Sequence, residues 1–154
     1  MPADFPVTML GRSSFLLGKL HSTLLDIESR ELGRIGLDVK QHAVLTVLAD
    51  EGPMTQQGMG LRLGIDRTTV VSVVDGLDEN GLVERRRSPT DRRAYLLTLT
   101  RSGRQAQRRG QRLVEGAEKR LFGGLSEEER ETIVELLARA LNGQPSQSIM
   151  PGAS

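Results

Sequence analysis

Two arginines follow an aspartate in the string Asp91-Arg92-Arg93, directly after the turn-forming residues Ser88-Pro89-Thr90. A guanidinium presents its donors in a planar fork that fits a phosphate group or the edge of a guanine. A carboxylate two residues before Arg93 can hold that guanidinium through charge-assisted hydrogen bonds. The spacing predicts a narrow, arginine-tipped turn that binds phosphates.

Positive charge gathers around this turn although the chain of 154 residues has a formal net charge of only +1. Residues 61–112 contain twelve basic and six acidic residues, a net charge of +6, whereas residues 1–60 and 113–154 have net charges of −2 and −3. A phosphate-binding surface requires such a concentration of charge. A solvated surface is the alternative explanation for a charge run taken alone.

Several classes of protein are not supported by the composition. Cysteine is absent, so disulfides and thiolate metal sites are excluded. The sequence has no apolar run of about 18 residues and no secretory signal, and we expect a cytoplasmic protein. His21 and His42 are the only histidines and lie in different predicted helices. We therefore expect no enzyme, no metal site and no cofactor.

The segment before the turn has the pattern of two short helices. Thr55 is expected to cap a helix over residues 56–63, and Gly64 turns the chain toward the next helix. Asp66 then caps a helix whose apolar stripe contains Val70, Val73, Val74 and Leu77, and Asn80-Gly81 ends it. Apolar-rich runs at 82–87 and 94–99 flank the arginine turn as a hairpin. The prediction is a mainly α fold with a small β-hairpin wing, a winged helix-turn-helix.

Longer helices are predicted on both sides of this lobe, from Met9 to about Arg34 and from Arg101 to about Leu121, with a last helix after a capping box at Ser126. The first helix has leucines at a narrow helical spacing, and the last has a similar stripe. These residues are Leu17, Leu20, Leu24, Ile133 and Leu137. Such a seam faces another helix, either within the chain or in a second subunit, and the length of the first helix favours a homodimer. We expect one domain over 1–142, with dimerisation helices at 9–36 and 101–142, a DNA-binding lobe at 37–100, and a disordered tail over 143–154.

The string D-x-R-x5-L-T from Asp91 to Thr100, preceded by LGIDRTTVVSVVDGL and ENGLVER, resembles the MarR (multiple antibiotic resistance regulator) family of winged-helix regulators. The resemblance covers nearly the whole folded chain. It implies that Arg93 enters a DNA minor groove with Asp91 as its brace, while Arg92 binds a phosphate. It also implies a repressor that binds a pseudo-palindromic operator as a homodimer.

On the predicted recognition helix, the exposed N-terminal side should enter a major groove. Its expected DNA contacts are Arg67, Thr68, Thr69, Val71 and Ser72. Thr55, Gln56 and Arg86 are expected to contact phosphates, and Arg85 and Arg87 are further candidates. The alternative class is a winged helix that binds only proteins.

Family members usually respond to small aromatic or phenolic molecules, bound where the dimerisation helices meet the DNA-binding lobe. The resemblance implies that such an effector would favour a spacing of the two lobes that mismatches the operator. Phe15, His21 and His42 are candidates for this crevice, and the alternative is that they are ordinary packing residues.

Overall fold

The computed structural model describes residues 5–143, and it is mainly helical with one two-stranded antiparallel sheet, as the sequence predicts. In chain order the elements are α1 (Val7–Leu10), α2 (Ser13–Gly33), α3 (Val39–Glu51), α4 (Gln56–Leu63), α5 (Arg67–Glu79), β1 (Val83–Arg87), β2 (Tyr95–Leu99), α6 (Arg101–Leu121) and α7 (Glu127–Asn142).

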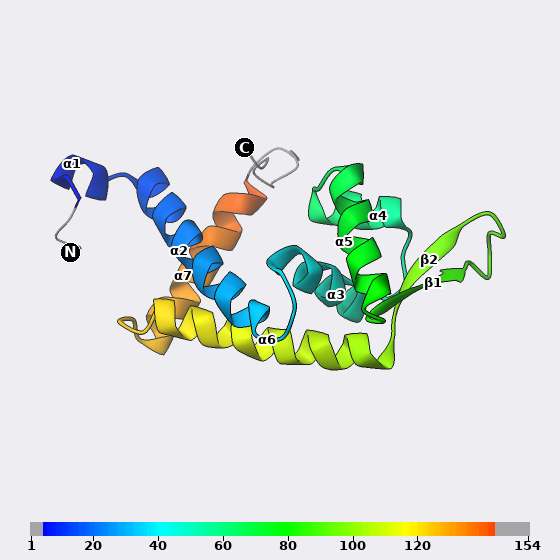
Figure 1. Cartoon of the computed structure of the whole chain (residues 1–154). Coiled ribbons are helices and arrows are strands. Elements are labelled where there is room, and N and C mark those ends of the chain that lie inside the picture. Colours follow the sequence, from blue (N-terminus) through cyan, green and yellow to red (C-terminus); the bar gives the residue numbers. More distant parts are fainter. Residues whose placement is uncertain (1–4, 144–154) are drawn as a thin grey trace.

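The long helix α6 runs along one side of the molecule and connects its two halves (Figure 1). Helices α3, α4 and α5 and the hairpin gather around its first half, and the hairpin projects from that end. Helices α2 and α7 lie at the other half of α6. Helix α3 packs on both α5 and α6, so it lies between the candidate recognition helix and α6.

Side-chain caps begin the helices where the sequence predicts them. The hydroxyl of Thr55 accepts from the backbone N–H of Gly58, and that of Thr100 accepts from the backbone of Gly103. Ser126 and Glu129 form the predicted capping box. Because these caps satisfy N–H groups that have no partner inside a helix, they fix where each helix begins.

The core lies almost wholly in the winged lobe. Apolar side chains of α3, α4, α5 and both strands fill it, with Leu32 of α2 added from outside. The buried residues of this cluster are Leu32, Leu37, Val44, Leu45, Leu48, Met59, Val70, Val73, Val74, Leu77, Val83, Leu97 and Leu99. Residue 97 of β2 also pairs with Met54 in an isolated bridge.

Two glycines inside helices allow close packing. A Cβ at Gly60 of α4 would lie 3.2 Å from the carbonyl oxygen of Ile65 and from a methyl group of Val70. A Cβ at Gly103 of α6 would lie only 1.9 Å from the carbonyl oxygen of Leu82. A side chain at either position would meet these neighbours, although glycine has an intrinsic cost of about 1 kcal/mol in a helix.

The prediction of one helix from Met9 to Arg34 is wrong at its start. The chain forms the single turn α1, breaks at Gly11-Arg12, and begins α2 at Ser13 because Arg12 has an extended backbone. The predicted disordered tail lies outside the described residues, apart from Gly143. None of the described helices is long and apolar enough to cross a membrane.

Candidate nucleic-acid interface

The start of α5 is held by Asp66. Its carboxylate accepts from the backbone N–H of Thr69 at 3.0 Å and from the Thr69 hydroxyl at 2.5 Å. These hydrogen bonds, the side-chain one first, hold the pKa of Asp66 below its usual range. The cap therefore stays ionised at neutral pH, where its charge also complements the positive end of the α5 dipole.

Helix α5 has the two sides that the sequence predicts. Its apolar stripe is buried in the core, while Arg67, Thr68, Val71 and Ser72 are exposed. Thr69 differs from the prediction, because its hydroxyl is engaged by Asp66 and the residue is only half exposed. Thr69 serves as part of the cap, and the presented side chains are the other four.

A recess of about 780 Å³ opens between α4 and α5, beside the exposed side of α5. Gln56 and Arg67, both predicted DNA contacts, line it together with Val71. Gln57 and Leu61 also line it, and sequence reasoning did not find them. Leu61 is 79% exposed, which is unusual for a leucine and extends the apolar contact surface that Val71 offers. The signal available in the sequence was the spacing of four between Gln57 and Leu61 on one helix.

The tip of the wing is held by short polar contacts. The buried hydroxyl oxygen of Ser88 accepts from the backbone N–H of Thr90 and of Asp91. The Asp91 carboxylate accepts from the backbone N–H of Arg93 at 2.9 Å. The predicted brace between Asp91 and Arg93 therefore acts on the main chain, and not on the guanidinium as expected. Arg92 and Arg93 are both exposed.

The arginines of β1 have different roles from one another. Arg85 donates to both Asp75 and Asp78 of α5, so it ties the hairpin to the helix. Arg86 pairs with Glu84 at 2.6 Å and remains exposed. Arg87 lies over the ring of Tyr95, 5.8 Å from its centroid. Among the described residues, Arg92 and Arg93 form no ion pair, in contrast to Arg85 and Arg86 of β1.

The three candidate effector residues do not come together in one chain. The Phe15 ring packs edge-on against Phe5, whereas His42 packs against Gly110 of α6. Leu32 also contacts Gly110, and a rise of 1.5 Å per residue places Phe15 about 25 Å from it along α2. His21 is exposed on α2.

His42 alone lies where α2, α3 and α6 meet. It is buried, and its Nε2 has no hydrogen-bond partner among the described residues. Burial lowers the pKa of His42, and the nearby backbone carbonyl of Gln107 opposes this. Across residues 5–143, no three His, Asp or Glu side chains are arranged to bind a metal ion.

An exposed recognition helix, its supporting helix and an arginine-tipped hairpin define a winged helix-turn-helix protein. The family model for the MarR family matches residues 35–94. A probable transcriptional regulator from Pseudomonas aeruginosa has a solved structure with a TM-score of 0.75 and 30% sequence identity, covering 86% of this chain and 98% of that one. The chain belongs to the MarR family of winged-helix transcriptional regulators.

Two other relatives are informative. A candidate transcriptional regulatory protein for the hcr operon of Thauera aromatica is 37% identical over 98 residues, which are 64% of this chain and 59% of that protein. The match thus spans less than two thirds of that relative. CouR from Rhodococcus jostii RHA1, solved with bound p-coumaroyl-CoA, is similar with a TM-score of 0.77 and 26% identity, covering 92% of this chain and all of that one (100%).

Proposed function

We propose that the protein regulates transcription by binding duplex DNA in a sequence-specific manner through its winged lobe, residues 37–100. The observation that carries this proposal is the two-sided α5, whose inner side is buried while Arg67, Thr68, Val71 and Ser72 are exposed. These four side chains can reach base edges and phosphates in a major groove. Arg93 at the wing tip is suited to an adjacent narrow minor groove, and Arg92 to a phosphate.

The regulator acts as a homodimer through residues 9–36 and 101–142. Apolar side chains on α2 and α7 support this, since Leu17, Leu20 and Leu137 are each about two fifths to one half exposed in the single chain. Leu24 and Ile133 are half-buried beside them. Pairing two chains would cover these side chains and present two recognition helices to half-sites about one helical turn apart. Repression would follow where the bound dimer blocks polymerase.

The dimer also responds to a small effector with an aromatic or phenolic group. CouR, with its bound p-coumaroyl-CoA, supports this part of the proposal. Within the chain, His42 is the best-placed candidate because its imidazole has an unpartnered nitrogen, among the described residues, at the junction of the two lobes. A cytoplasmic location belongs to the same proposal, since the regulator must reach DNA.

A fluorescence anisotropy titration of the full chain with genomic DNA fragments tests the function. We expect a minority of fragments to bind much more tightly than the rest, and we expect all binding to weaken as the salt concentration increases. Absence of binding at low salt would instead indicate a winged helix that contacts only proteins. Equal binding of all fragments would contradict sequence-specific regulation.

A further inference from the structure

Helices α2 and α6 form a second recess, of about 390 Å³, near the end of α6 that is remote from the wing. Three arginines, one glutamate and two apolar side chains line it. They are Ile27, Arg30, Glu31, Arg34, Arg120 and Leu121. The recess does not include any residue proposed to contact DNA.

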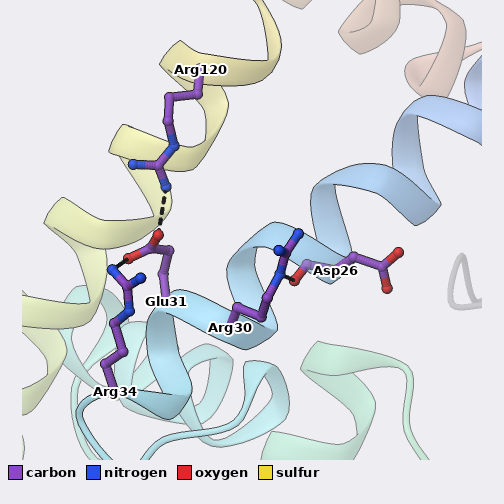
Figure 2. A network of polar contacts seen from close by, with 5 residues as sticks. All are labelled: Asp26, Arg30, Glu31, Arg34 and Arg120. Carbon is purple, nitrogen blue, oxygen red and sulfur yellow. Dashed lines mark hydrogen bonds and ion pairs between the residues drawn. The ribbon is translucent and has the colours of Figure 1, made fainter.

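Glu31 positions two of these arginines. One carboxylate oxygen accepts from Nη1 of Arg34 at 2.8 Å, and the other accepts from Nη2 of Arg120 at 2.9 Å (Figure 2). The Glu31 side chain is only 13% exposed, whereas those of Arg34 and Arg120 are 72% and 57% exposed. One mostly buried carboxylate therefore holds two solvent-accessible guanidiniums, one from the residue that follows the end of α2 and one from α6.

The cluster keeps positive charge and hydrogen-bond donors to spare. Arg30 uses Nε to donate to the backbone carbonyl of Asp26 at 3.2 Å, and Figure 2 shows the Asp26 carboxylate pointing away from it. Within the described part of the chain, each of the three guanidiniums donates a single hydrogen bond, to Glu31 or to the Asp26 carbonyl, so each retains further N–H groups. Three arginines and one glutamate give the recess a net charge of +2.

Cations in the last turns of α2 and α6 also complement the helix dipoles, and this explains why Arg30 and Arg120 are tolerated there. It does not explain why three arginines line one recess, two of them held by the same carboxylate. Forked guanidiniums fixed in this way suit a dianionic phosphate, which accepts several hydrogen bonds. Ile27 and Leu121 add an apolar wall that an organic group can contact.

We propose that this recess binds the phosphate group of a small-molecule effector, of the nucleotide or coenzyme A thioester class. The inference rests on the proposed effector response and adds to it a separate anchoring site for phosphate. Because the ligand would bridge α2 and α6, binding would fix how α2 lies against α6, the helix that follows the wing.

Isothermal titration calorimetry of the full chain with coenzyme A, inorganic pyrophosphate and benzoate tests the site. Saturable binding is expected for coenzyme A and pyrophosphate. Arg34→Gln combined with Arg120→Gln should weaken both at least tenfold and leave benzoate unaffected. Arg108→Gln removes a positive charge from an exposed position of α6 and should leave the affinities for coenzyme A and pyrophosphate unchanged. Tighter binding of coenzyme A than of pyrophosphate would assign an organic phosphate ester, and equal binding would assign the phosphate group alone.

Failure of both phosphate ligands to bind, or an equal loss in Arg108→Gln, would overturn the proposal. If circular dichroism shows that the double glutamine variant is unfolded, Arg34→Lys replaces it, because lysine keeps the charge but loses the fork and should still weaken binding. In a separate experiment, the wild type and the double variant are titrated with DNA in the absence of ligand. Weaker DNA binding by the double variant would assign the arginines to DNA and overturn the effector site, whereas absence of DNA binding by the wild type would overturn only the proposed function.

Discussion

The winged lobe (residues 37–100) and the helical lobe (α2, α6 and α7) differ in how fully a single chain buries their apolar side chains. All buried apolar residues of the core cluster except Leu32 lie between Leu37 and Leu99. By contrast, α7 has no buried residue, and Val134, Leu136, Leu137 and Leu141 are 40–67% exposed. Helix α2 buries only Leu32. The winged lobe is a closed unit, whereas the helical lobe has an apolar surface that needs a partner.

This difference distinguishes the stability of the folded chain from the stability of the dimer. Substitutions inside the winged lobe should act on the folding of one chain, because the contacts they change are intramolecular. Substitutions on α2 and α7 should act on association and, through it, on DNA affinity. Variants of the two lobes test this distinction.

Leu20→Glu combined with Leu137→Glu should dissociate the dimer, because carboxylates would be buried where apolar side chains meet. Loss of bivalent binding should weaken affinity for an operator by on the order of 100-fold. Sedimentation velocity measures the oligomeric state. Leu61→Glu adds the same charge to an exposed leucine of the winged lobe and should remain dimeric. A wild-type chain that sediments as a monomer would remove the basis of this prediction.

Gly103→Ala should destabilise the winged lobe by roughly 1–3 kcal/mol, because its Cβ would collide with the Leu82 carbonyl oxygen. Gly116→Ala, on the same helix with open space around it, should stabilise by about 0.5–1 kcal/mol. Urea denaturation monitored by circular dichroism measures both. If both substitutions change the free energy of unfolding in the same direction, the result would contradict the close packing of α6 on the hairpin.

Arg93→Ala should weaken DNA binding by about 1–3 kcal/mol, as for loss of a specific contact, and leave the free energy of unfolding unchanged. Arg108→Ala is the control, because it removes an equal charge from the exposed side of α6. Anisotropy titrations provide the two affinities. Unchanged affinity in Arg93→Ala would refute the assignment of the wing tip.

Arg85 and Arg92 should differ although both belong to the basic hairpin region. Arg92→Ala should reduce the slope of log affinity against log salt by about 1, because one phosphate contact is lost. Arg85→Ala should leave that slope unchanged and lower stability by about 0.5–1 kcal/mol, since its ion pairs with Asp75 and Asp78 are partly exposed. A reduced slope for Arg85→Ala would show that it contacts phosphate after all.

The smallest effect concerns pH and His42. Because burial lowers the pKa of His42 in the folded chain, the unfolded chain binds the proton more readily. Stability should therefore be fully present above the ordinary value of 6.5 and decrease as pH falls below it. His42→Asn should lose less stability than the wild type between about pH 7.5 and pH 5.5. An unchanged pH dependence in His42→Asn would contradict the burial of this imidazole.

Local signals explain what the sequence could predict. The helix starts at Asp66, Thr100 and Ser126 are confirmed because a cap involves residues only three apart. The buried stripe of α5 is confirmed because its spacing follows from helix geometry alone. The break at Gly11-Arg12 was missed because the leucine spacing between Leu10 and Leu17 continues across it.

Contacts between segments that are far apart in the sequence explain what the sequence could not predict. Arg85 could be recognised as a structural residue only once β1 lay beside Asp75 and Asp78 of α5. Glu31 and Arg120 are 89 positions apart, and no local pattern connects them. Thr69 was predicted to face DNA and Asp91 to hold the Arg93 guanidinium, but Thr69 hydrogen-bonds to Asp66 and Asp91 accepts from the Arg93 backbone.

Selection of bound sequences from random duplex DNA by the full chain tests whether the closed winged lobe binds specific DNA sequences and whether the exposed helical faces pair two such lobes. The expected result is enrichment of an inverted repeat whose half-sites are about one helical turn apart, and loss of the repeat in Leu20→Glu combined with Leu137→Glu. Enrichment of a single unpaired half-site, or of no sequence at all, would contradict it.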